Sequence, residues 1–221
     1  MLLDIAKGKN PIVMPLQNRI TPEGEFIAHP SRAGLFMGNR GILHDETKRL
    51  GQARWRHKHW IICRLAFGDR HREVMAKGAY TELFFLDEAV ALAAGHRPCA
   101  QCRRDAFNAF RAAIAGPGNT PWSAKAIDDV LHRLRIDERM KMPIRVGLAA
   151  ETLPAGAFIK MHGECWLIVG DKRLRYRPSG YDQAEPKPSG LVQVLTPMPT
   201  LGALRKGYRP ILHESAKGLI G

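Results

Sequence analysis

Two cysteines separated by two residues, in the run Cys99-Ala-Gln-Cys102, constrain this chain more than any other feature. They stand just before a segment that predicts a helix, so both thiols can point toward one ion in the manner of a zinc knuckle. Four cysteines in 221 residues are too sparse for a disulfide framework, and residues 1–15 do not have the pattern of a signal peptide. We therefore expect a cytoplasmic protein in which Cys99 and Cys102 bind zinc.

A closed tetrahedral zinc site needs two ligands beyond this pair. Spacing alone leaves two candidate pairs open. One is His59 with Cys63, upstream of the Cys99–Cys102 run, and the other is His162 with Cys165, downstream of it. His57 or His71 could also take the place of His59.

The charge of the chain points to its partners rather than to its fold. The formal net charge is +13, and residues 48–77 carry nine Lys or Arg against two acidic residues, with Trp55 and Trp60 among them. Basic side chains interleaved with aromatic ones suit phosphate contacts and base stacking. We expect a nucleic-acid partner, with DNA preferred over RNA. A solvated basic face and an anionic membrane surface are the alternatives, although no apolar run is long enough to span a membrane.

The expected nucleic-acid contacts come from two groups that the zinc would bring together. One group lies in the basic segment and the other flanks the cysteine pair; together they are Arg54, Arg56, Lys58, Arg97, Arg103 and Arg104.

Periodicity and turn signals predict an α+β fold. Helices are expected over 88–94, 103–115 and from 123 to about 140, with Asp87 and Ser123 as N-caps and Gly95 at a helix end. A hairpin is expected over 60–75, further strands over 80–86, 158–161, 166–169 and 191–195, a loop over 177–190, and a short helix over 201–206. The expected organisation is a basic domain at 1–142, with a small zinc-stabilised hairpin-plus-helix module at about 55–115, and a separate β-rich part at 143–221.

The run from Phe85 to Asp105, which contains Ala-Gly-His-Arg-Pro-Cys-Ala-Gln-Cys, resembles the Ada-type metal-binding domain. That family has a short Ala-rich helix followed by Gly, an aromatic residue and Arg-Pro-Cys-x-x-Cys. Its other two ligands lie upstream as Cys-x-x-x-Cys, where this chain has His59-x-x-x-Cys63. The resemblance, which spans about 59–105, therefore implies the ligands His59, Cys63, Cys99 and Cys102 and leaves Cys165 as a buried thiol.

The same resemblance implies a zinc-stabilised nucleic-acid-binding protein in DNA processing or repair. It does not carry over the methyl transfer of the Ada protein. His59 stands where that protein has its methyl-accepting cysteine, and an imidazole cannot perform the thiolate chemistry.

A catalytic site is less clearly marked, because the chain has no Walker A, G-x-S-x-G, H-E-x-x-H or dinucleotide-binding motif. The polar residues His29, Asn39, His44 and Asp45 lie in a Gly-rich segment and could hold a phosphate or a flipped base and move protons. A hydrolytic enzyme of the nuclease or base-excision type is therefore one alternative function. A protein–protein adaptor is another, and a surface loop whose polar groups satisfy one another is the plain structural interpretation of this segment.

Overall fold

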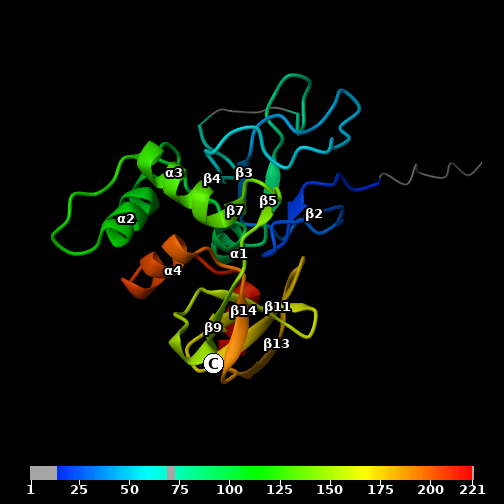
Figure 1. Cartoon of the computed structure of the whole chain (residues 1–221). Helices are drawn as coiled ribbons and strands as arrows, with labels where there is room; N and C mark the ends of the chain where they lie inside the picture. Colours follow the sequence, from blue (N-terminus) through cyan, green and yellow to red (C-terminus); the bar gives the residue numbers. More distant parts are fainter. Residues whose placement is uncertain (1–13, 69–72, 221) are drawn as a thin grey trace, which may run out of the picture.

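The computed structural model describes residues 14–68 and 73–220. It contains helices and strands in several sheets, as expected for an α+β fold. Figure 1 shows the second half of the chain forming a sheet below the first, with α2, α3 and α4 grouped on one side.

The first sheet has six strands in the order β2-β1-β5-β3-β4-β6. Their bounds are β1 Arg19–Ile20, β2 Phe26–Ile27, β3 Phe36–Asn39, β4 Ile61–Arg64, β5 Leu83–Phe85 and β6 Arg97–Pro98. Strand β3 runs antiparallel to β4 and β5, whereas β6 lies parallel to β4. A Cβ atom on Gly38 would stand 2.0 Å from the Ile61 carbonyl oxygen, so only glycine permits this approach of β3 to β4.

The expected hairpin over residues 60–75 is corrected by this pairing. Its first strand exists as β4, but its antiparallel partner is β3 and not the segment that follows. Residues 73–75 are not a strand, and residues 69–72 lie outside the described part of the chain.

Helix α1 (Glu88–Ala93) lies between β5 and β6, and α2 (Arg104–Ala115) and α3 (Ala124–Arg135) follow β6. Asp87 caps α1 by accepting a hydrogen bond from the Val90 N–H at 2.9 Å, and Ser123 caps α3 in the same way at 3.2 Å. Gly95 follows α1 at φ +87°, a conformation that favours glycine. These features confirm the expected helix starts and the expected end of α1.

Helix α3 ends earlier than expected, at Arg135 instead of near residue 140. The residues beyond it form a small hairpin of β7 (Ile136–Asp137) and β8 (Met142–Pro143). The Asp137 carboxylate closes the turn by accepting hydrogen bonds from the N–H groups of Arg139 and Met140. Such side-chain bonding to the backbone competes with helix continuation.

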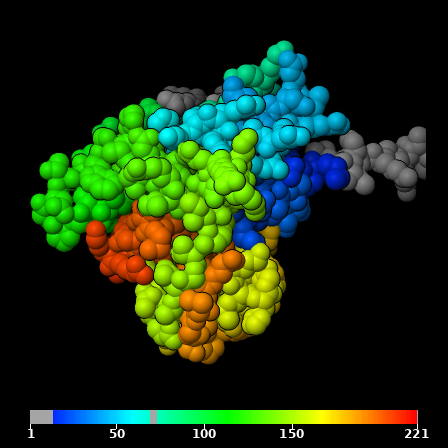
Figure 2. All heavy atoms as spheres, in the orientation of Figure 1, coloured from blue at the N-terminus to red at the C-terminus, as the bar shows by residue number. Residues whose placement is uncertain are grey.

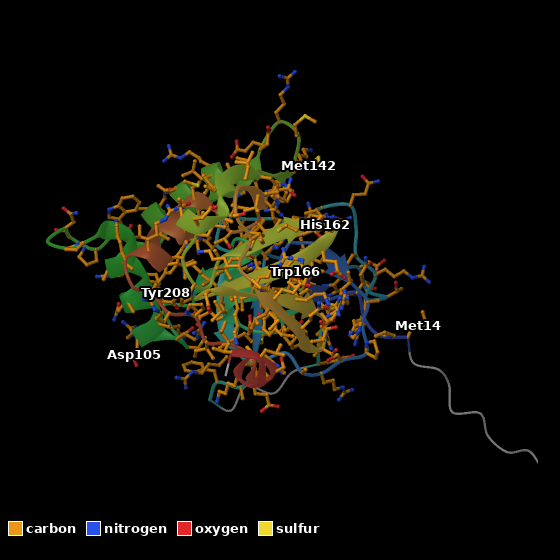
Figure 3. All side chains as sticks on the ribbon, turned by 90° about the horizontal axis from the view of Figure 1, so that it is seen from below. Met14, Asp105, Met142, His162, Trp166 and Tyr208 are labelled. Carbon is orange, nitrogen blue, oxygen red and sulfur yellow. The ribbon has the colours of Figure 1, made fainter. Side chains whose placement is uncertain are left out.

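The second sheet is antiparallel, with six strands in the order β13-β12-β11-β10-β14-β9. Their bounds are β9 Val146–Ala149, β10 Phe158–Met161, β11 Glu164–Val169, β12 Lys172–Arg177, β13 Gly180–Pro186 and β14 Leu191–Val194. Figure 3 marks the β10–β11 hairpin with His162, in its turn, and Trp166, on β11. Strand β13 occupies half of the loop expected over 177–190, and cross-strand ion pairs such as Arg175–Asp182 hold it to β12.

Helix α4 (Met198–Arg205) follows the second sheet in the chain but packs beside α2 and α3. The remaining elements are two 3-10 turns, η1 (Ala150–Thr152) and η2 (Glu214–Ala216), and a short helix, α5 (Lys217–Ile220). Buried apolar side chains of both sheets, such as Phe85 and Phe158, belong to one core. The separate folding of 1–142 and 143–221 stays a prediction. Among the described residues, no helix combines the length and the apolar composition that a membrane crossing requires.

Candidate metal centre and its basic surroundings

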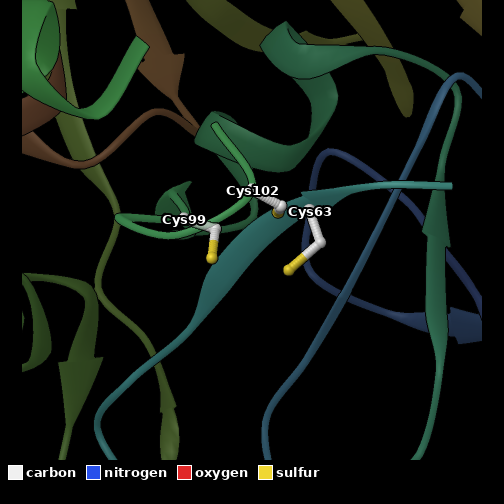
Figure 4. Close-up of side chains that lie close together, drawn as sticks. All are labelled: Cys63, Cys99 and Cys102. Carbon is white, nitrogen blue, oxygen red and sulfur yellow. The ribbon is translucent and has the colours of Figure 1, made fainter. Parts of the chain in front are cut away.

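Three cysteine side chains converge on one point of the first sheet (Figure 4). Cys63 lies on β4, Cys99 directly follows β6, and Cys102 lies in the turn before α2. Their sulfur atoms all lie within 4.8 Å of one another. The Cys99 N–H donates to the Ile62 carbonyl at 2.9 Å, so the parallel pairing of β4 with β6 positions two elements of the cluster.

The thiols interact strongly with one another. Hydrogen bonds from Cys102 and then Cys63 lower the pKa of Cys99, because they stabilise its thiolate. Hydrogen bonds to Cys102 and Cys99, followed by burial, raise the pKa of Cys63. One of the three thiols therefore ionises readily, whereas ionisation of a second thiol requires a positive charge close to the sulfur atoms.

This donor set fits a metal ion. Thiolates are soft ligands that select zinc, copper(I) or iron–sulfur centres. Cys99 and Cys102 are buried and Cys63 is half-buried, so the cluster could hold a metal ion. In the described part of the chain no histidine or carboxylate joins the three sulfurs.

The structure places the other ligand candidates elsewhere. The Nδ1 atom of His59 lies 2.7 Å from Oδ2 of Asp128, and the His59 side chain is 59% exposed. The His57 ring neighbours that of His59 at 5.7 Å between centroids, and His71 lies outside the described residues. Cys165 is buried, which raises its pKa to about 12, and its thiol donates to Glu23 at 3.6 Å; His162 is exposed.

The six basic residues expected to contact nucleic acid fall into two classes. Arg54, Arg56, Lys58 and Arg104 are exposed. Arg97 and Arg103 are buried, at 4% and 5% exposure, and form ion pairs with Asp128 at 2.7 Å and Glu88 at 2.9 Å. Because their charges are already matched inside the protein, these two arginines are not part of the basic surface.

The catalytic candidates do not assemble into one site. His29 accepts a hydrogen bond from the Ser31 N–H, and Asn39 accepts one from the Gly41 N–H. His44 bonds to Thr81, and Asp45 accepts from the backbone of Thr47 and Arg49. Within the described ranges none of the four hydrogen-bonds to another, and His29, Asn39 and Asp45 bond to the backbone of their own loops.

Comparison with models of protein families, with curated proteins and with solved structures found no match. The Ada-type resemblance therefore rests on the sequence motif, and the clustering of Cys63 with Cys99 and Cys102 is the structural finding that accords with it.

Proposed function

We propose that the chain is a zinc-stabilised nucleic-acid-binding protein that acts in DNA processing or repair. The observation that carries this proposal is the position of the three-thiol cluster. Its Cys63 lies on β4, and residues 51–60, which lead directly into β4, expose Arg54, Arg56 and Lys58. We call residues 51–60 the basic loop.

The basic loop is fixed at several points, which supports a binding role. The Arg56 N–H donates to the Arg40 carbonyl at 2.8 Å, and the Arg135 guanidinium donates to the Lys58 carbonyl at 2.7 Å. The Arg97 N–H donates to the Trp60 carbonyl at 3.0 Å. A loop held in this way can present its cations with little loss of entropy on binding.

Zinc, when bound, supplies the link between β4 and the turn before α2. Metal affinity becomes folding energy wherever a site forms only on folding. We expect about one zinc per chain in protein purified without added metal, as a single tetrahedral site requires. Elemental analysis measures this ratio and separates zinc from iron and copper. Cys63→Ser should lower the zinc content, whereas Cys165→Ser should leave it unchanged; zinc-free protein that melts normally would contradict the zinc assignment.

Nucleic-acid binding is tested by its dependence on salt. Each phosphate contact releases counterions, so the affinity should fall steeply as salt rises. The variant Arg56→Ala/Lys58→Ala should flatten the slope of log K against log[salt] by about one unit per lost contact. The matched control Arg205→Ala/Lys217→Ala removes two exposed charges from the C-terminal part and should bind like the parent. If the parent shows no salt-dependent binding to single- or double-stranded DNA or RNA, the adaptor function replaces this proposal.

A further inference from the structure

A small cavity lies behind the basic loop, between it and the β7–β8 hairpin. Its volume is about 210 Å³, and its walls come from the ends of β3 and α1, from the basic loop and from residues 135–143. Figure 2 shows the cyan segment near residue 50 and the light-green segment near residue 140 meeting on one face. Pockets for drug-sized ligands measure about 300–1,000 Å³, so this cavity suits a small ligand or one end of a larger one.

The cavity wall is built around Trp60, which is 2% exposed. The guanidinium carbons of Arg40 and Arg135 each lie 3.9 Å from its ring centroid. Two guanidinium groups do not fit on one face at that distance, so the indole is held between them. Trp55 lies next to it at 6.0 Å between ring centroids and is half-buried.

Among the described residues the two buried arginines have no ion-pair partner, and the carboxylates of Glu25 and Asp128 act on Arg40 and Arg135 only from a longer distance. Arg40 and Arg135 are 2% and 3% exposed, and in the described residues no carboxylate lies within ion-pair distance of either. Arg40 donates to the Ala94 carbonyl and to His96, and Arg135 donates to the Gly95 and Lys58 carbonyls. The Nε of Arg135 is buried and has no hydrogen-bond partner among the described residues.

Two carboxylates do line the cavity, Glu23 and Glu25, but they leave it positive. Glu23 is already bound by Lys160 at 2.6 Å, and the cavity wall also contains Arg54, Lys141 and Arg145. Burial lowers the pKa of Arg40 to about 9, which leaves it charged at neutral pH. Unpaired buried cations are costly, and an anion entering the cavity would offset that cost.

We propose that this cavity binds one nucleotide, with the base against the half-buried Trp55 side chain and the phosphate facing the Arg40 and Arg135 guanidinium groups. Bases stack on indoles and on guanidinium planes, and arginine is the preferred phosphate partner. The nucleotide has two possible sources, a free nucleoside monophosphate or an unpaired nucleotide of a bound strand. The second source rests on the proposed function, because the strand would first bind at the basic loop, which supplies Trp55 and Trp60.

The first arm of the test uses adenosine monophosphate, with adenosine and inorganic phosphate as separate probes, titrated calorimetrically into the full chain. We expect the monophosphate to bind more tightly than either probe. Trp55→Ala should weaken binding about 5- to 100-fold, as loss of one base–aromatic stack predicts. Trp122→Ala, at a tryptophan that is 39% exposed and outside the cavity, is the matched control and should have no effect. Arg135→Lys keeps the charge but removes the planar fork, and it should also weaken binding.

The second arm uses a single-stranded oligodeoxynucleotide with one 2-aminopurine, and its duplex. If a strand nucleotide enters the cavity, the 2-aminopurine fluorescence should fall on binding to the parent and not on binding to Trp55→Ala. Monophosphate binding without any strand binding would support the cavity as a free-nucleotide site and contradict the proposed function. Strand binding that is equal in parent and Trp55→Ala, without monophosphate binding, would overturn the cavity proposal and leave the proposed function standing.

Discussion

Two regions of buried charge in this protein, one at the start of α1 and one around Trp60, differ in how that charge is matched. At the start of α1, Asp87 accepts hydrogen bonds from the Tyr181 hydroxyl at 2.7 Å and the His213 N–H at 3.0 Å. Its neighbour Glu88 forms an ion pair with Arg103 at 2.9 Å and accepts a hydrogen bond from Tyr208. Around Trp60, Arg40 and Arg135 have only neutral partners.

The charges at the start of α1, which we call the α1 group, stabilise the fold. The charges around Trp60 are available to bind a ligand. The α1 group connects the first half of the chain to β13 and to the segment after α4, because its partners come from those elements. Arg40 and Arg135 in the Trp60 region line a cavity, and neither forms an ion pair with a described residue. Removing one member should therefore cost stability in the first region and ligand affinity in the second.

The largest expected effect is on Arg103. Arg103→Met leaves the Glu88 carboxylate buried without its cation, and breaking a buried pair in this way costs about 3–5 kcal/mol. Urea unfolding of the full chain measures it, with Arg205→Met, at an exposed arginine, as the control. A loss below about 1 kcal/mol, typical of exposed pairs, would show that the α1 group does not hold the fold.

The hydroxyl of Tyr181 has the next largest expected effect. Tyr181→Phe removes a buried hydrogen bond to the Asp87 carboxylate, and bonds to charged groups contribute about 1.5–3 kcal/mol. Tyr176→Phe is the matched control, because Tyr176 is buried nearby on the same sheet and its hydroxyl has no hydrogen-bond partner in the described part of the chain. Equal losses in the two variants would contradict the role of the Asp87 bond.

A pH effect on stability is expected from His96, which accepts a hydrogen bond from Arg40. Burial, and then the Arg40 charge, lower the pKa of His96 well below its ordinary value. The folded state therefore resists a proton that the unfolded chain accepts, and stability should fall as the pH drops below about 6.5. The slope contributed by one such group is at most about 1.4 kcal/mol per pH unit.

Denaturant unfolding at pH 7.5, 6.5 and 5.5 measures this slope, and His96→Gln should make it shallower. Because a nucleotide phosphate would shield the Arg40 charge, bound ligand should also reduce the slope. If the parent and His96→Gln show the same pH dependence of stability, protonation of His96 does not contribute to it.

The smallest stability effect is expected at Arg40. Arg40 has no ion pair to lose, and removing its buried charge also removes a desolvation cost, so Arg40→Met should change the free energy of unfolding by less than about 1 kcal/mol. The same variant should lose the stabilisation that adenosine monophosphate gives the parent in a thermal melt. A loss as large as that of Arg103→Met would abolish the distinction between the two regions.

The features that sequence predicted well are local ones. Asp87 as an N-cap, Gly95 after α1 and the start of α2 behind Cys102 each depend on a few adjacent residues. The Cys99–Cys102 pair was likewise visible as a motif. Cys63 could be joined to it only through the Ada-type resemblance, since its approach depends on the pairing of β4 with β6 across 32 intervening positions of the chain.

The features that sequence did not predict depend on distant partners. Counting charges could not distinguish the buried Arg97 and Arg103 from exposed Arg104, because Asp128 and Glu88 neutralise the first two only in the folded chain. The Gly and Pro residues in and around β13 predict a loop, whereas ion pairs to β12 hold this segment as a strand. The two arginines that stack on Trp60 come from the end of β3 and from α3, and no sequence motif links these two positions.

The contrast between matched and unmatched arginines is tested most directly by the Nε–H resonances of the full chain labelled with ¹⁵N-arginine. Adenosine monophosphate is added stepwise, and the signals are assigned with Arg40→Met, Arg135→Lys, Arg97→Lys and Arg103→Met. The account predicts that the Arg40 and Arg135 signals shift with saturation, because the phosphate gives them the anion they lack, while the Arg97 and Arg103 signals stay in place. Shifts confined to exposed arginines, or no saturable shift at Arg40 and Arg135, would contradict it.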